Sequence, residues 1–235
     1  MPPVVYAVGD VHGCADELVG LVERIEDHAR GLRVARPVVV FLGDYVDRGP
    51  DSARVLEFLS SPGLGELFDP VLLMGNHDLQ MLRAWGDQLA AAELFRWLAD
   101  WGGAETVESY GVTTGHRTVP ELMADFRAAV PRRHLEVLAA LKLSHRIGGL
   151  FFCHAGVDPD VSLDNQTDVT LLYGIRGFLR RRDDFGARIV HGHYAVPDVE
   201  ILSNRINVNS SAGYPGGRLS AVAIAGQDIE VIAAP

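Results

Sequence analysis

The sequence predicts an α/β protein, and three observations support that fold class. In the first third of the chain, short apolar runs alternate with stretches that have helical spacing. The middle of the chain is rich in helix-forming residues, and the remainder returns to short apolar runs separated by glycine turns. An alternation of this kind is typical of a parallel sheet with helices packed on its faces.

The first third has a βαβαβ pattern. Strands are expected at residues 4–8, 38–42 and 71–74, and helices at 15–29 and 52–59. Each expected strand runs directly into a glycine followed by Asp or Asn: Gly9-Asp10, Gly43-Asp44 and Gly75-Asn76. Ligands of open α/β sheets bind beyond the carboxyl ends of the strands, so we expect these turns to converge on one crevice.

The rest of the chain divides into a helical part and a strand-rich part. Residues 79–141 contain strong helix formers and two prolines at expected helix starts, and we interpret them as a helical cap within a single domain spanning residues 1–235. Beyond residue 141, apolar runs predict strands at 143–147, 150–153, 187–190, 199–202, 205–208, 218–224 and 229–233. These strands are expected to form a second, largely antiparallel sheet packed on the first.

Composition and charge restrict the class of protein. Hydrophobic residues make up 48% of the chain and charged residues 22%, as in ordinary globular proteins. No apolar run approaches the roughly 18 residues of a membrane span, and Met1-Pro2-Pro3-Val4 lacks the positive start of a signal peptide, so we expect a cytoplasmic protein without a membrane partner. The net charge of -10 argues against a nucleic-acid partner, because neutralising phosphates requires a basic face. The sequence does not indicate which oligomeric state the protein adopts.

Histidines mark the same strand ends. Five of the nine histidines lie in glycine-flanked turns: His12, His77, His154, His191 and His193. Asp10 and His12 are two residues apart, so on an extended strand end both side chains point to the same side and can reach one ion. A ligand set of Asp, His and Asn without thiolates suits manganese, iron, zinc or cobalt better than calcium or a structural zinc site.

Taken in order, five motifs resemble the signature of a known family. They are Gly9-Asp10-Val11-His12-Gly13, GDYVDRG at 43–49, Gly75-Asn76-His77, His154-Ala155-Gly156 and Gly192-His193. This set is similar to the calcineurin-like metallophosphoesterases of the phosphoprotein-phosphatase family, which are related to symmetrical dinucleoside tetraphosphatases. Segments at 101–103, 108–111 and 175–176 resemble the bacterial and bacteriophage Ser/Thr protein phosphatases of that family. The resemblance implies a four-layer α/β/β/α sandwich with a helical cap insertion.

The resemblance also implies two divalent metal ions, with manganese first and iron, zinc, cobalt or nickel as alternatives. The implied ligands of the first ion are Asp10, His12 and Asp44, and those of the second are the bridging Asp44 with Asn76, His154 and His193. His193 is preferred to His191 because it follows Gly192 as the last histidine of the family follows its glycine.

A hydrolytic mechanism follows from the same resemblance. A hydroxide bridging the two ions would attack phosphorus in line, because two Lewis acids lower the pKa of water toward neutrality. Arg48 and Arg176 would clamp the phosphoryl oxygens through bidentate guanidinium contacts. His77 would protonate the leaving group, and Asp47 would orient the ring and favour its charged form.

The leading hypothesis for function is a Ser/Thr phosphoprotein phosphatase. One alternative is a symmetrical dinucleoside tetraphosphate hydrolase with the same chemistry, and another is an inactive relative that binds phosphoproteins. The partner would thus be a phosphorylated protein or a small phosphoester or nucleotide substrate. Specificity is expected to reside in the cap at 79–141 and in the loop at 156–170.

Other features have both a structural and a functional interpretation. Trp85, Trp97 and Trp101 fit packing of the cap better than a substrate groove. The three consecutive arginines at 180–182 fit a solvated face better than a phosphate site. Residues 209–211, Asn-Ser-Ser, stand where many relatives have Asp-Thr-Gly. This difference is expected to affect the residues that surround the metal ligands, or the rim of the substrate site.

Overall fold

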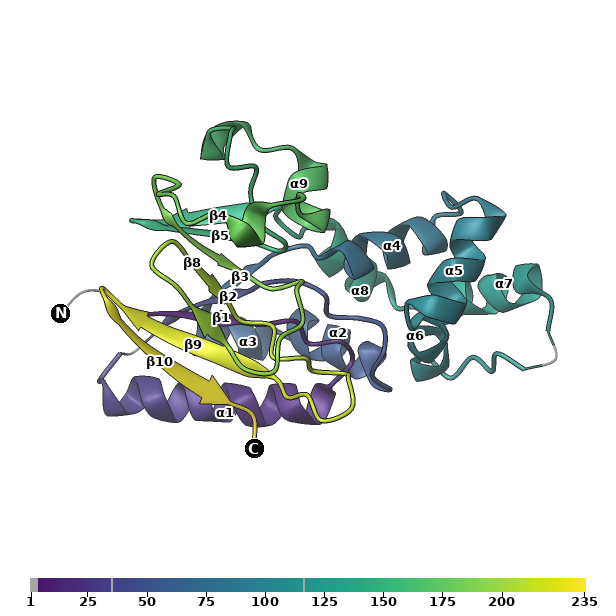
Figure 1. Ribbon diagram of the computed structural model, residues 1–235. Coiled ribbons are helices and arrows are strands. Elements are labelled where there is room, and N and C mark those ends of the chain that lie inside the picture. The colour runs from purple at the N-terminus through teal and green to yellow at the C-terminus, as the bar shows by residue number, and fades with distance from the viewer. Residues whose placement is uncertain (1–3, 35, 116) are drawn as a thin grey trace.

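The computed structural model describes residues 4–34, 36–115 and 117–235. Residues 1–3, on which the expectation of no signal peptide rests, lie outside this part of the chain, and the cytoplasmic location stays a prediction. No helix among the described residues is long and apolar enough to cross a membrane. Figure 1 shows two stacked sheets with helices on both outer faces and a further group of helices to one side.

The first sheet contains strands from both ends of the chain. Its order is β10-β9-β1-β2-β3, and its strands are β1 (Val5–Val8), β2 (Val38–Phe41), β3 (Asp69–Leu72), β9 (Ser220–Ala225) and β10 (Asp228–Ala233). β1, β2 and β3 pair in parallel, with Ala7 opposite Val40 and Val40 opposite Val71, as the βαβαβ pattern predicts. The crossovers are α1 (Ala15–Gly31) and then α2 (Ser52–Ser60) with α3 (Pro62–Leu67).

The last two strands contradict the prediction from the sequence pattern. We expected 218–224 and 229–233 in the second sheet, but β9 pairs antiparallel with β1, with Val222 opposite Ala7, and β10 pairs with β9. β1 is buried along its whole length. Left at the edge of the sheet, such a strand would bury unpaired backbone N–H and C=O groups, and β9 supplies their partners.

The second sheet is mixed rather than largely antiparallel. Its order is β4-β5-β6-β8-β7, and its strands are β4 (Ser144–Ile147), β5 (Leu150–Cys153), β6 (Arg188–His191), β7 (Glu200–Ile201) and β8 (Arg205–Asn207). β5, β6 and β8 run parallel, while β4 and β7 are antiparallel edges. The connection from β5 to β6 contains η1 (Leu163–Asn165), α9 (Asp168–Tyr173) and η2 (Phe178–Arg180). A connection of this length can return the chain to the end of the sheet where β5 begins, as the parallel pairing of β5 and β6 requires.

Alternating side chains define four layers. On β1, Tyr6 and Val8 pack with the helices of the first layer, whereas Val5 and Ala7 pack between the two sheets. On β5, Phe152 joins the core between the sheets, and its two neighbours pack outward beneath α9 and η2. The structure therefore has the α/β/β/α arrangement that the resemblance implies.

The middle of the chain is helical, as the sequence predicts. Its helices are α4 (Asn76–Trp85), α5 (Ala91–Asp100), α6 (Gly103–Ser109), α7 (Val119–Ala129) and α8 (Arg132–Ala139), and they extend to one side of the sheets in Figure 1. Trp97, Phe126 and Leu138 belong to the same hydrophobic core as α1 and α2, which fastens these helices to the first layer. The division into one domain with a cap at 79–141 stays a prediction.

Candidate metal centre

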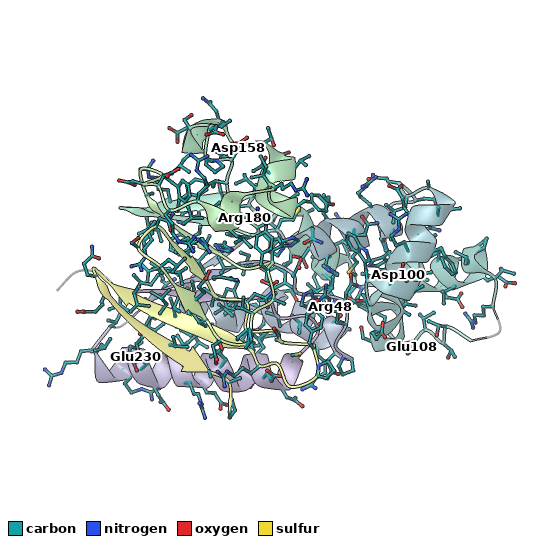
Figure 2. All side chains as sticks on the ribbon, in the orientation of Figure 1. Arg48, Asp100, Glu108, Asp158, Arg180 and Glu230 are labelled. Carbon is teal, nitrogen blue, oxygen red and sulfur yellow. The ribbon has the colours of Figure 1, made fainter. Side chains whose placement is uncertain are left out.

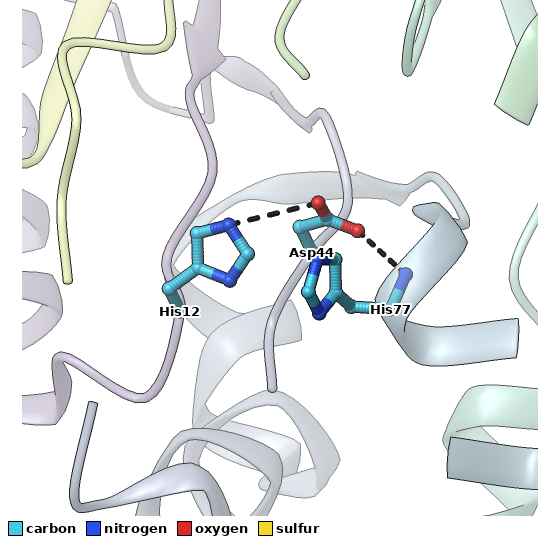
Figure 3. Close-up of side chains that lie close together, drawn as sticks. All are labelled: His12, Asp44 and His77. Atoms are coloured by element: carbon cyan, nitrogen blue, oxygen red, sulfur yellow. Dashed lines mark hydrogen bonds and ion pairs between the residues drawn. The ribbon is translucent and has the colours of Figure 1, made fainter. Parts of the chain in front are cut away.

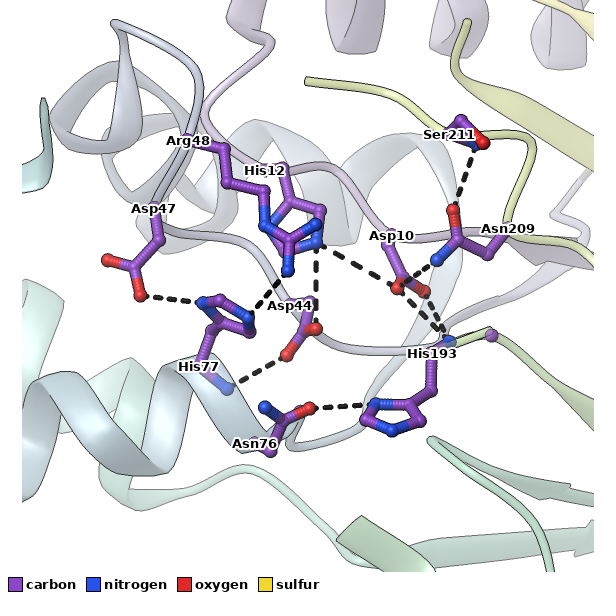
Figure 4. Close-up of polar contacts among 12 residues, drawn as sticks. Asp10, His12, Asp44, Asp47, Arg48, Asn76, His77, His193, Asn209 and Ser211 are labelled. Carbon is purple, nitrogen blue, oxygen red and sulfur yellow. Dashed lines mark hydrogen bonds and ion pairs between the residues drawn. The ribbon is translucent and has the colours of Figure 1, made fainter. Parts of the chain in front are cut away.

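The predicted ligands lie on turns that follow strands of both sheets. Asp10 follows β1, Asp44 follows β2, Asn76 begins α4 after β3, His154 follows β5 and His193 follows β6. Figure 4 shows Asp10, His12, Asp44, Asn76 and His193 meeting from these separate segments. The two sheets therefore present the carboxyl ends of their parallel strands to the same place, as the Gly-Asp and Gly-Asn turns predict.

Tight backbone turns make this convergence possible. His12 and Asp44 have positive φ values of 43° and 53°, a region that side chains other than glycine seldom adopt. Gly75 and Gly192 have no room for a side chain: a Cβ at Gly75 would lie 2.1 Å from Asp44 Oδ1, and one at Gly192 would lie 2.0 Å from Asp10 Oδ1. Glycine at both positions thus allows the backbone to approach the two carboxylates closely.

Asp10, His12 and Asp44 form one half of the centre. His12 Nε2 lies 3.6 Å from Asp44 Oδ2 and 4.0 Å from Asp10 Oδ2, and Figure 3 shows the ring directed at Asp44. His12 Nδ1 donates to the Val46 carbonyl oxygen at 3.0 Å, so the lone pair of Nε2 faces the carboxylates. Burial lowers the pKa of His12 to about 3, which keeps the ring in the neutral form that a metal binds.

Asn76, His154 and His193 form the other half. Asn76 Oδ1 lies 3.0 Å from His154 Nε2 and 2.9 Å from His193 Nδ1, and the two ring nitrogens are 3.2 Å apart. His154 Nδ1 donates to the Leu42 carbonyl oxygen at 2.9 Å, so Nε2 again faces inward. Because His154 Nε2 is also 3.4 Å from Asp44 Oδ2, Asp44 is shared between the two halves.

This set of donor atoms fits metal cations. Carboxylate oxygens, an amide oxygen and imidazole lone pairs face one another at the centre, and acceptors in this arrangement repel unless positive charge lies between them. Burial opposes the charged form of His154, but Asp44 and Asp10 outweigh burial and raise its pKa to about 9. The cluster thus attracts positive charge strongly, and its mixed nitrogen and oxygen ligands suit divalent transition metals.

His77 is held through both ring nitrogens and is not free to bind a metal, although its ligand atom lies within 4.8 Å of those of His12 and Asp44. Its Nδ1 lies 2.7 Å from Asp47 Oδ2, and its Nε2 lies 3.1 Å from Arg48 Nη2 (Figure 4). Burial lowers the pKa of His77, but Asp44 and Asp47 outweigh burial and raise it. The structure therefore brings together the predicted general acid His77, its orienting carboxylate Asp47 and the predicted phosphate clamp Arg48.

Arg48 lies between the strands and the helical segment, as Figure 2 shows. Its guanidinium carbon is 4.3 Å from the centroid of the Tyr214 ring, which holds the planar group in place by a cation–π contact. The backbone N–H of Arg48 donates to the Gly102 carbonyl oxygen at 3.3 Å. A guanidinium anchored in this way beside His77 can clamp phosphoryl oxygens at the centre.

Two residues that support Asp47 are not identified from the sequence. Trp97 Nε1 donates to both Asp47 oxygens, at 3.2 and 3.0 Å, and Thr106 Oγ1 donates to Asp47 Oδ1 at 2.7 Å. Trp97 is fully buried, so its predicted packing role holds, but it also fixes the carboxylate that orients His77. Trp97 lies on α5 and Thr106 on α6, each 50 or more positions from Asp47 in the sequence. No local motif signals such contacts.

Two more polar residues hold candidate ligands in place, one through the backbone and one through a carboxylate. Asp78 accepts hydrogen bonds from the backbone N–H groups of Asp44 and Gly75, each at 2.8 Å. In the sequence, the position of Asp78 directly after His77 is the feature that points to this role. Asn209 Nδ2 donates to Asp10 Oδ2 at 2.6 Å. The segment that departs from the pattern of the relatives therefore contacts a candidate ligand directly.

Arg176 is not brought into contact with the other predicted residues. It is exposed in the turn between α9 and η2 and lines a cavity of about 360 Å³ together with Tyr173 and Tyr194. Within the described part of the chain, its side chain forms no hydrogen bond or ion pair, so its role stays a prediction. His191 is buried against Phe178, with ring centroids 5.2 Å apart, and the geometry favours His193 as the ligand.

The chain is similar in sequence to known proteins. The model of the calcineurin-like phosphoesterase family matches residues 3–227. A symmetrical bis(5'-nucleosyl)-tetraphosphatase of Klebsiella pneumoniae is 44% identical over 78 residues, which are 33% of this chain and 24% of that protein. The match thus spans about a quarter of the length of this curated relative.

Solved structures resemble the whole chain. A candidate diadenosine tetraphosphatase has a TM-score of 0.66 at 22% identity, with 100% of this chain and 95% of the other covered. A cold-active protein-tyrosine phosphatase of a Shewanella species has a TM-score of 0.61 at 17% identity, with 99% and 81% covered. Likeness at such identities shows the fold alone. Because the family model matches almost the whole chain, this protein belongs to the calcineurin-like phosphoesterase family.

Proposed function

We propose that this protein is a metal-dependent phosphoester hydrolase that cleaves dinucleoside tetraphosphates symmetrically and releases two nucleoside diphosphates. The observation that carries the proposal is the 44% identity over 78 residues to the symmetrical tetraphosphatase of Klebsiella pneumoniae. A Coxiella burnetii protein of the same name is 42% identical over 81 residues. The Ser/Thr phosphoprotein phosphatase, which the motifs place first, becomes the second candidate.

The ligands in this proposal are those of the two halves of the centre. Asp10 and His12 would hold one divalent ion, Asn76, His154 and His193 would hold the other, and Asp44 would touch both. When bound, such ions polarise the phosphoryl group and lower the pKa of water. Manganese is proposed first because the ligands are nitrogen and oxygen without thiolate, and iron, zinc, cobalt and nickel are the alternatives.

The protein's own residues would position the substrate and balance its charge. In the reaction, water adds to one inner phosphorus, the bridging P–O bond breaks, and its electron pair leaves with the second nucleoside diphosphate. Arg48 would clamp oxygens of the attacked phosphoryl group, and Arg176 would assist from its exposed turn. His77, oriented by Asp47, would face the leaving oxygen.

The second candidate differs in its leaving group. The serine alkoxide of a phosphoprotein requires a proton, whereas a departing phosphate group has a pKa of about 6 and requires little. Resemblance of residues 175–176 to the Ser/Thr phosphatases favours this candidate. The inactive phosphoprotein-binding alternative is not carried further, because the full ligand set converges together with His77 and Arg48.

HPLC of a digest of diadenosine tetraphosphate by the Mn²⁺-loaded protein tests the proposal. Symmetrical cleavage yields ADP as the only nucleotide product. Release of ATP with AMP would show asymmetric cleavage and overturn it. Intact diadenosine tetraphosphate beside phosphate release from a phosphoserine peptide would establish the second candidate instead. Asp44→Asn is the inactive control, because it removes charge from the carboxylate shared by both halves.

A further inference from the structure

A small cavity adjoins the metal centre on the side of His77. We call it the distal cavity; its volume is about 140 Å³, and it is lined by Gln80, Arg83, Glu93, Arg96, Trp97, Trp101 and Tyr173. The lining comes from α4, α5 and the end of α9, so the distal cavity lies where the helical segment meets the second sheet's connection. Pockets that enclose a whole drug-sized ligand are larger, about 300–1,000 Å³. This one suits a single charged group.

Two contacts place the distal cavity beside the leaving-group side of the centre. The Trp101 ring lies 5.0 Å from the His77 ring, centroid to centroid. Trp97 donates to Asp47, which in turn orients His77. Trp97 and Trp101 also line the distal cavity, so the cavity lies directly beyond the residues that surround His77.

The charge of the distal cavity is positive. Arg83 is half-buried and Arg96 is exposed, and within the described residues neither side chain forms a hydrogen bond or an ion pair. Arg127 of α7 shows the contrast, since its guanidinium is paired with Asp87 at 3.0 Å. Glu93 is the one acidic residue in the lining, and its carboxylate accepts a hydrogen bond from the backbone N–H of Ala90 at the start of α5. Two unpaired guanidinium groups thus remain available to an anion.

We infer that the distal cavity binds the second phosphate group of the leaving nucleoside diphosphate, through Arg83 and Arg96. The inference rests on the proposed function, because it assigns the far side of His77 to the leaving group. Guanidinium forks bind phosphate oxygens bidentately, and within the described residues neither Arg83 nor Arg96 pairs with a candidate metal ligand. Trp101, which lines the cavity beside His77, is then part of the substrate groove, while Trp97 packs in the core and supports Asp47.

This subsite also accounts for how a phosphoanhydride leaving group is stabilised. A departing nucleoside diphosphate carries its charge on phosphate oxygens of pKa about 6 and is released as an anion. Fixed positive charge near that anion stabilises it in the transition state. A phosphoserine substrate has no second phosphate, so the distal cavity favours phosphoanhydrides over phosphomonoesters.

Competitive inhibition of p-nitrophenyl phosphate hydrolysis tests the subsite without a natural substrate. The probes are pyrophosphate, which reaches from the centre into the distal cavity, and orthophosphate, which does not. We expect pyrophosphate to bind the Mn²⁺-loaded wild type about tenfold more tightly than orthophosphate. Arg83→Gln and Arg96→Gln should each raise the inhibition constant of pyrophosphate about tenfold, since a charge-assisted hydrogen bond is lost. Both should change the inhibition constant of orthophosphate less than about twofold.

Arg132→Gln on α8 is the matched control: it removes the same charge from a guanidinium that is 90% exposed and is paired, among the described residues, with its helix neighbour Glu136. Titration calorimetry with ADP gives a second measurement, in which the Arg83 and Arg96 variants should bind about tenfold more weakly and Arg132→Gln should not. Equal losses for pyrophosphate and orthophosphate, or no loss for either, would overturn the subsite.

The two proposals fail in different ways. If the wild type leaves diadenosine tetraphosphate intact while Arg83→Gln loses its preference for pyrophosphate, the subsite stands and the proposed substrate is wrong. If the wild type produces ADP and the Arg83 and Arg96 variants keep their preference for pyrophosphate, the proposed function stands and the subsite is overturned.

Discussion

Replacement of Trp97 by Phe is expected to destabilise the protein and to slow its turnover, because it removes a buried donor from Asp47. The indole N–H donates to the two carboxylate oxygens at 3.0 and 3.2 Å, and both side chains are fully buried. A hydrogen bond to a charged group contributes about 1.5–3 kcal/mol, so the expected loss in the free energy of unfolding is about 2 kcal/mol. In a chain of 235 residues, this lowers Tm by roughly 4–8 °C.

Urea unfolding followed by circular dichroism measures this loss. Trp85→Phe is the control, because Trp85 Nε1 donates only to the uncharged Arg127 carbonyl oxygen, at 3.4 Å, and its loss should be about 0.5–1 kcal/mol. A double-mutant cycle of Trp97→Phe with Asp47→Asn separates the hydrogen bond from the change in ring volume, with an expected coupling of about 1 kcal/mol. A coupling below about 0.5 kcal/mol would refute the role of Trp97 as a support of Asp47.

Three further predictions concern the centre. Removal of metal with EDTA should abolish hydrolysis and lower Tm by roughly 5 °C or more, with Mn²⁺ restoring both, because the buried carboxylates lose their counter-charge; an unchanged calorimetric Tm would contradict this. Gly192→Ala should weaken Mn²⁺ binding at least about tenfold in titration calorimetry, because the added Cβ lies 2.0 Å from Asp10 Oδ1, whereas Gly65→Ala has open space and should have no effect. His77→Asn should lower kcat for a phosphoserine peptide by about 10²–10⁴-fold and that for p-nitrophenyl phosphate far less; equal losses would remove the role of general acid.

The ligand set is the part of the site that the sequence anticipates best. Each ligand follows a strand and stands in a short motif with glycine, as in Gly9-Asp10 and Gly75-Asn76. Such motifs are local, because the turn, the close backbone approach and the metal ligand occupy adjacent positions. The tertiary structure then explains why glycine is required, since a Cβ at Gly75 or Gly192 would collide with a carboxylate.

Contacts between distant segments are the part that the sequence does not anticipate. Trp97 and Thr106 reach Asp47 from α5 and α6. The distal cavity likewise joins Arg83, Arg96 and Tyr173 from three helices. None of these residues has a neighbour in sequence that signals the contact.

By itself the sequence determined the α/β class, the βαβαβ pattern of its first third, and the residues at the ends of the parallel strands of that pattern. These features depend on periodicity and on turn chemistry, which act over a few residues. Only the tertiary structure decided that β9 and β10 complete the first sheet beside β1, because strand pairing depends on which edge must be covered and not on the apolar run itself. The tertiary structure also decided the positive charge of the distal cavity, because Arg83 and Arg96 lie on separate helices that meet beside His77.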